Sequence, residues 1–235
     1  MSGTLYLLPN RIADVCPEDV LPKKTLSVAQ SCTYFLAENA KSARLFLKTI
    51  HHPKPIRDLT VIEIGHEPDS RRFNEWLQPI LTGLDACIVS ESGCPGVADP
   101  GAGLVREAHR AGIPVVSLVG PCSILLTLMA SGLNGQRFRF LGYLPIEPEK
   151  RDAALVRLEN ESRRGETEIF IETPYRNNKM LEALATKLSP ETLVTVAIDV
   201  TGANESIRTQ KASAWRQEIG KLQKVPTVFA ILSMH

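Results

Sequence analysis

Two segments of the chain combine glycine, proline and polar side chains directly after a short apolar run. Residues 90–101 read SESGCPGVADPG and residues 120–123 read GPCS. Glycine lets a ligand approach the backbone closely, and proline fixes the shape of a loop. Connections from a strand to a helix usually span about 2–6 residues. A longer loop that carries Glu91, Ser92 and Asp99 therefore predicts a ligand-binding loop.

Several kinds of site are disfavoured by the spacing of residues. No Gly-x-x-x-x-Gly-Lys-Ser/Thr motif is present, and Gly101 and Gly103 lack the third glycine of a dinucleotide motif. The five cysteines are odd in number and never spaced as Cys-x-x-Cys, which argues against disulfides and a zinc knuckle. His51 and His52 have no metal-ligand spacing around them. We therefore expect neither a nucleoside triphosphate nor a metal.

Composition predicts a globular protein without a strong electrostatic field. Apolar residues make up 43% of the chain, charged residues 23%, and the net charge is +1. Binding of a polyanion would need a local basic patch. The basic pairs at 71–72, 150–151 and 163–164 predict solvated mixed faces, and a composite RNA-binding patch is the alternative. No signal peptide or apolar run of about 20 residues is visible, so we expect a cytoplasmic protein outside the membrane.

Short apolar runs predict the elements that must position the two loops. Five strands are expected at residues 5–8, 34–37, 61–65, 86–89 and 114–119. Runs that are apolar on both faces suit a parallel sheet covered by helices. Asp99 is the expected N-cap of a helix that ends at Gly112, and Ser123 is the expected cap of a helix over 124–131. Both loops then lie at the carboxyl ends of strands, where open α/β sheets bind ligands.

A second alternation follows a turn-rich linker. Strands are expected at 169–171, 193–198 and 227–232, with a helix over 177–188. We therefore expect an α/β protein of two domains, an N-terminal domain over 1–134 with a mostly parallel sheet and a C-terminal domain over 135–235. The cofactor cleft would lie between them.

The loop at 90–101 resembles the Ser-Asp-Ala-Gly-x-Pro…Asp-Pro-Gly loop of the tetrapyrrole (corrin and porphyrin) methylase superfamily. It is most similar to the branch that methylates a ribose 2′-hydroxyl in small-subunit ribosomal RNA. Residues 119–123 resemble that branch's Pro-Gly-Pro-Cys-Ala motif. Further similar segments are residues 3–6, 37–39, 137–145 and 172–176. The resemblance covers most of the chain in the same order.

The resemblance implies that S-adenosylmethionine binds in a cleft between two α/β domains of a homodimer. Glu91, Ser92, Gly93, Val97 and Ala98 would line the methionine and ribose side. The remaining expected contacts are Cys122 and Ser123, which would close the pocket, Pro226 and Thr227 near the adenine, and Pro9 and Tyr175. Methyl transfer needs an aligned acceptor and at most a base. The candidates for an acid or base are Glu38, Asp199 and Glu205.

Two segments depart from the family pattern, and the loop at 90–101 is not one of them. The branch's Glu-Leu-Thr-Lys-x-x-Glu motif appears as residues 199–205, with Gly202 in place of lysine. The turn after the first strand lacks the branch's glycine. We expect a methyltransferase whose acceptor is an RNA ribose 2′-hydroxyl in preference to a tetrapyrrole or other small molecule. The alternative is a non-catalytic sensor that binds S-adenosylmethionine.

Overall fold

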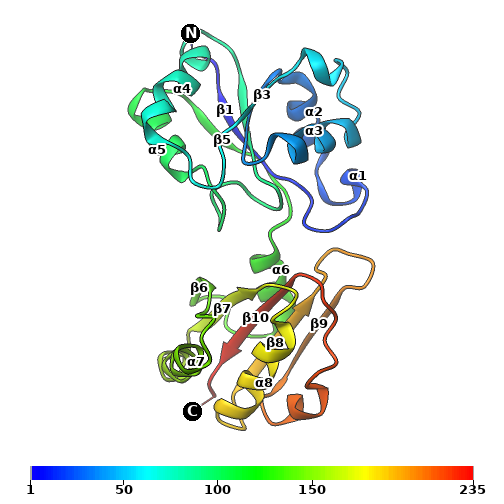
Figure 1. Ribbon diagram of the computed structural model, residues 1–235, viewed down its shortest axis with the longest axis vertical. Helices are drawn as coiled ribbons and strands as arrows, with labels where there is room; N and C mark the ends of the chain where they lie inside the picture. Colours follow the sequence, from blue (N-terminus) through cyan, green and yellow to red (C-terminus); the bar gives the residue numbers. More distant parts are fainter. Residues whose placement is uncertain (1, 235) are drawn as a thin grey trace. The chain divides into compact units, whose positions relative to one another are not determined.

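The computed structural model describes residues 2–234 and divides into two compact units (Figure 1). The first unit extends to Cys122 and the second begins at Ser123. The sequence analysis put the boundary near residue 134, because the turn-rich segment there resembles a linker. Helix α6 (Ser123–Ser131) accounts for the difference, since it packs against strands of the second unit. No helix among residues 2–234 is long and apolar enough to cross a membrane.

The first unit is built on a five-stranded sheet in the order β3-β2-β4-β1-β5, with all neighbouring pairs parallel. The strands are β1 (Leu5–Leu8), β2 (Tyr34–Ala37), β3 (Thr60–Glu63), β4 (Ala86–Val89) and β5 (Val115–Ser117). The helices are α1 (Pro17–Val20), α2 (Lys23–Ser31), α3 (Ala40–Thr49), η1 (Ile56–Asp58), η2 (Ser70–Arg72), α4 (Phe73–Leu81) and α5 (Ala102–Arg110). The predicted parallel sheet and its five strands are confirmed.

Alternation of side chains along the strands gives this sheet two apolar faces. On β2, Leu36 packs with Trp76 of α4 and Leu104 of α5. Phe35 points to the other face, where it packs with residues of α2 and α3 such as Phe46. Figure 1 shows α4 and α5 on one side of the sheet and α2 and α3 on the other. The sheet is therefore the middle of three layers, which explains why its strands are apolar on both faces.

The second unit has a mixed five-stranded sheet in the order β6-β7-β10-β8-β9. Only the β6–β7 pair is parallel among these strands. The strands are β6 (Phe138–Tyr143), β7 (Thr167–Glu172), β8 (Leu193–Ile198), β9 (Ser206–Lys211) and β10 (Thr227–Leu232). The helices after α6 are α7 (Pro148–Ser162), α8 (Asn177–Lys187) and η3 (Ala214–Glu218).

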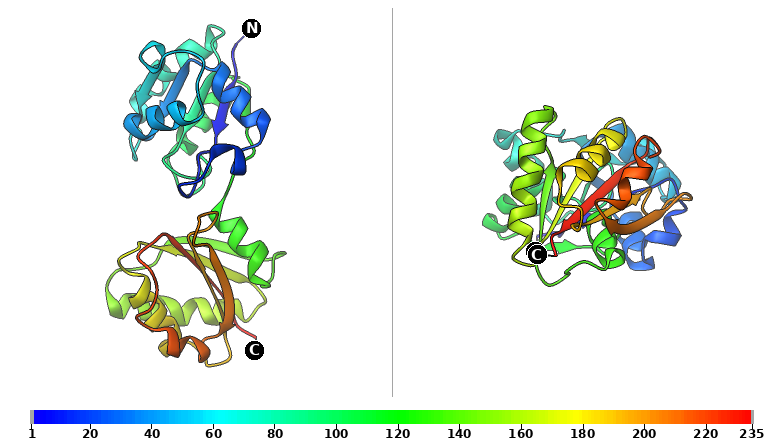
Figure 2. Two further views of the ribbon diagram at one scale, coloured as in Figure 1. Left: turned by 90° about the vertical axis from the view of Figure 1, so that its right-hand side faces the viewer. Right: turned by 90° about the horizontal axis from the view of Figure 1, so that it is seen from below.

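Helices α7 and α8 lie side by side on one face of the second sheet (Figure 2, right). Their apolar side chains join Phe170 and Phe229 of the sheet in one core, where the two rings stack with centroids 5.7 Å apart. Helix α6 shares no residue with that core and contacts β8, β9 and β10 instead.

Three elements of the second unit and two helix starts differ from the predictions. The presumed linker at 137–139 is the beginning of β6, and neither α7 nor β9 was predicted, because both are strongly polar. Helix α5 begins at Ala102 with Gly101 as its N-cap at φ 126°, so Asp99 does not cap it. Ser123 is the first residue of α6 and not a residue before it.

Candidate functional site

The carboxyl ends of three neighbouring strands form a row at one edge of the first sheet. Val89 of β4 pairs with Leu8 of β1 on one side and with Ala37 of β2 on the other. The next residues, Ser90, Pro9 and Glu38, therefore begin neighbouring loops. The chain leaves β1 and β2 towards the face of α2 and α3 and leaves β4 towards the face of α5. Such a divergence opens the crevice in which α/β sheets bind ligands.

The loop at residues 90–101 has a backbone that requires its glycines. Gly93, Gly96 and Gly101 have φ values of 69°, 79° and 126°, in the region that side chains disfavour. Ala98 also has a positive φ, 62°, which is strained for a residue with a side chain. Gly93 is buried, whereas the predicted cofactor contacts Glu91, Ser92, Val97 and Ala98 are exposed. The loop thus exposes four side chains from a constrained backbone.

Asn10, the second residue after the end of β1, anchors this loop. Its side-chain amide donates to the carbonyl oxygens of Ser90 at 3.3 Å and Glu91 at 3.0 Å. Its backbone N–H donates to the Gly93 carbonyl at 2.8 Å. Asn10 is only 7% exposed, so these bonds are shielded from water. Asn10 was not among the residues predicted from the sequence. An amide side chain just after a buried strand was the signal that could have identified it.

Glu38, a predicted acid or base, has both carboxylate oxygens engaged. Oε2 accepts from the Glu91 N–H at 3.0 Å, and Oε1 lies 3.0 Å from His66 Nδ1. Ser42 donates to the Glu91 carboxylate at 2.6 Å. The bond to Glu38 raises the pKa of exposed His66 above its ordinary value. Glu38 therefore ties the loop after β2 to the loop after β4, and His66 joins that contact.

The Asp99 carboxyl group at this edge has a pKa well above its ordinary value. Burial raises its pKa to about 6, the negative charge of Glu38 adds to the effect, and a hydrogen bond with Ser90 opposes it. The side chain thus faces Ser90 and the acidic cluster instead of the helix that it was expected to cap. Carboxylates gathered at one crevice suit a ligand that carries positive charge.

The loop after β5 packs directly on the loop after β1. A Cβ on Gly120 would lie 2.3 Å from Cβ of Pro9, so only glycine fits there. The Cys94 thiol lies 3.4 Å from the Pro121 carbonyl oxygen, and its hydrogen bond with Cys122 is the main cause that raises its pKa. The structure therefore brings together Pro9, Glu38, Glu91–Ala98 and Cys122 at one edge of the first unit.

The remaining predicted residues lie in the second unit, and most share one edge of its sheet. Thr227 at the start of β10 pairs with Glu172 at the end of β7 and with Ile198 at the end of β8. Tyr175 follows β7 and is 81% exposed, within 5.9 Å of the Lys224 ammonium. The Asp199 N–H donates to the Pro226 carbonyl at 3.1 Å. Ser123 lies apart, at the start of α6.

Thr227 is held from within its own unit. The buried amide of Asn177 donates to its hydroxyl at 2.8 Å, and that hydroxyl lies 3.1 Å from the Val225 carbonyl. Asn177 also donates to the Val225 carbonyl at 2.8 Å. Thr227 is only 3% exposed. Any ligand contact here would come from the backbone around Pro226, and Asn177 is a further residue that the sequence analysis did not select.

Glu172 and Arg176 form a largely buried ion pair at the same edge. Arg176 Nη2 lies 2.5 Å from Glu172 Oε1, and Arg176 Nε donates to the Thr173 hydroxyl at 3.2 Å. Arg176 Nη1 is buried without a partner. Tyr175 is thereby presented outwards from a turn that this pair fixes.

The turn at residues 199–205 is closed by its own carboxylates. Asp199 accepts from the Asn204 N–H at 3.0 Å, and Glu205 accepts from the Thr201 N–H at 2.6 Å. Asp199 and Thr201 have φ values of 49° and 67°. A Cβ on Gly202 would lie 2.3 Å from the Asp199 carboxylate. A lysine at position 202 would therefore displace Asp199.

Comparison with known proteins identifies the family. The model of the Tetrapyrrole (Corrin/Porphyrin) Methylases matches residues 16–214. Ribosomal RNA small subunit methyltransferase I of Vibrio cholerae is 37% identical over 87% of this chain and 67% of its own length. The protein of that name from Escherichia coli O157:H7 is 31% identical over 87% of this chain and 68% of its own.

Solved structures share the fold at lower identity. The methyltransferase CobJ is 20% identical, with a TM-score of 0.65 over 99% of this chain and 95% of its own. The uroporphyrin-III-C-methyltransferase from Thermus thermophilus is 18% identical, with a TM-score of 0.57 over 99% and 93%. The family model spans the first unit's loop cluster and most of the second unit. The chain therefore belongs to the tetrapyrrole (corrin/porphyrin) methylase family and is a methyltransferase.

Proposed function

We propose that this protein transfers the methyl group of S-adenosylmethionine to a ribose 2′-hydroxyl of small-subunit ribosomal RNA. The observation that carries the proposal is the loop at 90–101, fixed by Asn10 and Glu38 at the carboxyl edge of a parallel sheet. The curated relatives named as ribosomal RNA methyltransferases support the acceptor. Such an acceptor also points to the cytoplasm.

The residues at this edge fit the chemistry of the cofactor. S-adenosylmethionine supplies a methyl group on a positively charged sulfonium, and it also carries an ammonium and two ribose hydroxyls. Exposed Glu91 and half-buried Asp99 provide negative charge and hydrogen-bond acceptors for these groups. A Cβ added to the buried Gly93 would lie 3.3 Å from Cγ2 of Ile12, so Ile12 packs closely against the Gly93 backbone. Ser92, Val97 and Ala98 would contribute the adjoining surface.

Alignment is the main contribution that the chain would make to the reaction. Holding acceptor and donor in line converts a bimolecular step into an effectively unimolecular one. Glu38 is assigned a positioning role, because both of its oxygens already hold His66 and the Glu91 N–H. Asp199 and Glu205 are assigned a similar role in the second unit, because each accepts a backbone N–H of its own turn.

Transfer of radiolabelled methyl groups to a small-subunit ribosomal RNA transcript or particle tests the proposal. We expect incorporation that maps to a ribose and is lost in Gly93→Val, because a β-branched residue at φ 69° distorts the loop. Binding of the cofactor without transfer to any RNA would instead favour the non-catalytic sensor. Failure to bind the cofactor at all would overturn the proposal.

We also propose a homodimer. Helix α6 exposes Leu125 and Met129, with exposed fractions of 48% and 79%, one turn apart on one face. Exposed apolar side chains that lie next to each other on one face of a helix are typical of interaction surfaces. Sedimentation of the wild type and of Met129→Glu would test this, and a monomeric wild type would refute it.

A further inference from the structure

The small net charge of the chain conceals a strongly basic segment. From the start of α2 to the end of η1, residues 23–58 hold seven lysines and arginines but only two carboxylates, Glu38 and Asp58, a net charge of +5. The whole chain carries +1, so the remainder carries −4. Apart from the pair Lys23-Lys24, these cations stand singly in the sequence, so five of the seven lie outside any basic pair.

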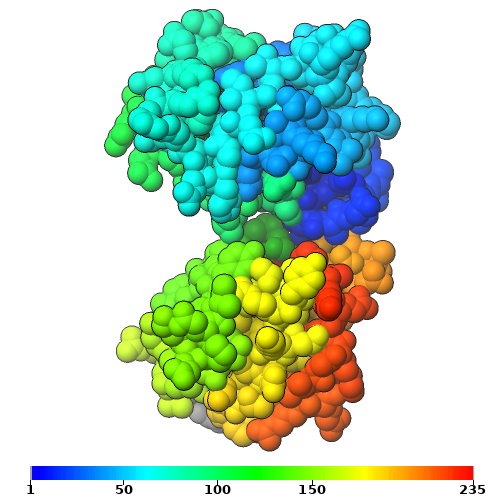
Figure 3. Space-filling view, in the orientation of Figure 1, coloured from blue at the N-terminus to red at the C-terminus, as the bar shows by residue number. Residues whose placement is uncertain are grey.

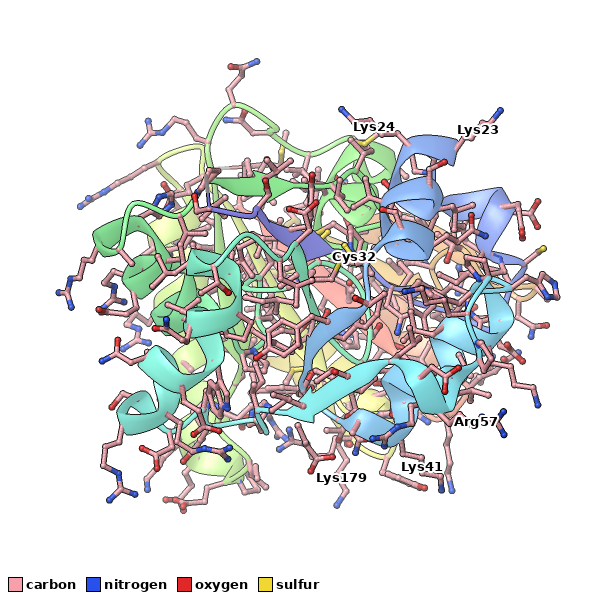
Figure 4. All side chains as sticks on the ribbon, turned by 90° about the horizontal axis from the view of Figure 1, so that it is seen from above. Lys23, Lys24, Cys32, Lys41, Arg57 and Lys179 are labelled. Atoms are coloured by element: carbon pink, nitrogen blue, oxygen red, sulfur yellow. The ribbon has the colours of Figure 1, made fainter. Side chains whose placement is uncertain are left out.

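The fold gathers these cations on one layer of the first unit. Helices α2 and α3 and the turn η1 pack on the same apolar face, and the Gln30 side chain of α2 donates to the Ile50 carbonyl after α3 at 2.7 Å. All seven cationic residues are exposed: Lys23, Lys24, Lys41, Arg44, Lys48, Lys54 and Arg57. Figure 4 shows the four of them that it labels pointing outwards, Lys23 and Lys24 at one margin of this layer and Lys41 and Arg57 at the other. Figure 3 shows α3 and the segment after it as continuous surface.

Helix α3 places three of these cations in a row. Lys41, Arg44 and Lys48 are spaced by three and four residues, which puts them on one helical face opposite the buried Phe46 and Leu47. With a rise of about 1.5 Å per residue, the row spans about 10 Å. Among residues 2–234, Arg57 is the one cation of the seven with a carboxylate within 4.0 Å, that of Asp58 at 3.7 Å. The positive charge of the row is therefore not neutralised by the protein.

The row begins at the candidate site. Ser42, in the first turn of α3, donates to the Glu91 carboxylate of the loop at 90–101 at 2.6 Å. Lys41 is its neighbour in sequence. A polyanion lying along α3 would thus reach the edge of the sheet that holds the proposed cofactor contacts, within the same unit.

The arginines of the second unit make a useful contrast. A hollow of about 660 Å³ there is lined by Arg137, Arg139, Arg157 and Arg164, but also by Glu161 and Glu166. Arg139 is paired with Glu161 and Glu168. Carboxylates thus lie among the arginines of this hollow, whereas the row on α3 has none within 4.0 Å in the described part of the chain, so the hollow is the weaker candidate for binding phosphate.

We infer that the exposed face of α2, α3 and η1 is the surface that binds the sugar-phosphate backbone of the RNA acceptor. The inference rests on the proposed function for the identity of the polyanion. Lysine and arginine contacts to phosphate release counterions, so binding through this face is independent of sequence and falls steeply with salt.

The experiment compares two triple variants of equal charge in the full chain. Lys41→Gln/Arg44→Gln/Lys48→Gln removes the row. Arg106→Gln/Lys179→Gln/Lys221→Gln removes three exposed cations elsewhere. Binding to a small-subunit ribosomal RNA transcript is measured over a range of salt, and binding of S-adenosylhomocysteine is measured in parallel. We expect the α3 variant to bind RNA at least about tenfold more weakly and to lower the slope of log affinity against log salt by about 2, at about 0.7 per phosphate.

Each result has a defined reading. The control triple is expected to keep the wild-type RNA affinity and slope, and both triples are expected to keep the wild-type affinity for S-adenosylhomocysteine. Equal RNA binding by the wild type and the α3 variant overturns the inference and leaves the proposed methyltransferase intact. Wild-type protein that binds no RNA overturns both the inference and the RNA acceptor. Absence of S-adenosylhomocysteine binding by the wild type overturns the proposed function, and the comparison of RNA binding by the two triples still decides the inference.

Discussion

Two glycine-bearing turns, the loop at 90–101 and the turn at 199–205, show opposite ways of holding a strained backbone. The first is fixed by side chains distant in sequence, Asn10 and Glu38, which bond its carbonyls and its N–H from other strand ends. The second is fixed by Asp199 and Glu205, which bond N–H groups inside the same seven residues. Both contain non-glycine residues with positive φ.

The shape of the loop at 90–101 depends on residues from several strand ends, whereas the turn at 199–205 is held by its own side chains. Disturbing a distant residue should reshape the first loop and its ligand contacts. Disturbing the second should have local effects, unless one of its carboxylates takes part in the reaction.

The largest effect is expected from Gly120→Ala. The new Cβ would lie 2.3 Å from Cβ of Pro9, so the loops after β1 and β5 could not both keep their positions. Overpacking of this kind costs about 1–3 kcal/mol, and we expect the upper end together with a loss of S-adenosylhomocysteine binding of about 100-fold. Gly135→Ala is the matched control, since its Cβ would meet no atom within 4 Å. Equal stability and equal S-adenosylhomocysteine binding in the two variants would show that the contact between Gly120 and Pro9 does not limit the side chain at position 120.

Asn10→Ala is expected to be the next most harmful. It removes the amide that serves the Ser90 and Glu91 carbonyls, and buried acceptors left without a donor cost about 1–3 kcal/mol. Chemical denaturation should show a loss of about 2 kcal/mol, with weaker cofactor binding. Asn204→Ala should leave both unchanged, because Asn204 is exposed and serves its turn through its backbone N–H. A larger loss of stability or cofactor binding in Asn204→Ala than in Asn10→Ala would contradict this prediction.

Asp99→Asn should stabilise the protein in a pH-dependent way. Because the folded-state pKa of Asp99 is raised to about 6 from 3.8, the folded chain binds that proton more tightly than the unfolded chain. Wild-type stability should therefore fall as pH rises from about 4 to 6 and stay reduced above that range. For a partly solvated carboxyl we expect the variant to gain roughly 1–2 kcal/mol at pH 7.5 and nothing below pH 4.

Denaturation at several pH values checks this prediction. Asp58→Asn on the exposed η1 turn is the control, since its ion pair with Arg57 is solvated and worth little. A destabilised Asp99→Asn at pH 7.5 would mean that the ionised carboxylate is needed by the fold.

The smallest effect is expected from Asp199→Asn. The amide oxygen can still accept from the Asn204 N–H, so stability should change by less than about 0.5 kcal/mol and methyl transfer by less than about twofold. Asp199→Ala, which removes the hydrogen-bond acceptor, should lose more stability and more methyl-transfer activity than Asp199→Asn. Loss of transfer by about 100-fold in Asp199→Asn with unchanged stability would identify an acid or base instead of a turn-closing group.

Much of the first unit was predictable from sequence because its signals are local. Buried strands such as Ala86–Val89 are continuous apolar runs, and the loop at 90–101 is marked by its own glycines and length. The exposure of Val97 and Ala98 and the burial of Gly93 agree with a ligand-facing loop on a packed backbone.

The parts that were missed depend on partners distant in sequence. Asn10 matters because the fold brings it beside residues 90–93. Asp99 faces Ser90 because the helix after it begins two residues later than a capping rule predicts. Strand β9 is polar because one face of an edge strand is solvated, and it resembles a loop until its pairing with β8 is known. The chain divides after Cys122, ahead of the turn-rich segment near residue 134, because α6 packs on the second sheet.

The central claim is that the loop at 90–101 is a cofactor surface whose geometry is set by Asn10 from another strand end. Calorimetric titration of the full chain with S-adenosylhomocysteine, for the wild type and for Asn10→Ala, tests it most directly. The account predicts saturable binding at one site per chain in the wild type and clearly weaker binding in the variant. No binding at millimolar ligand, or equal affinity in the two proteins, would contradict it.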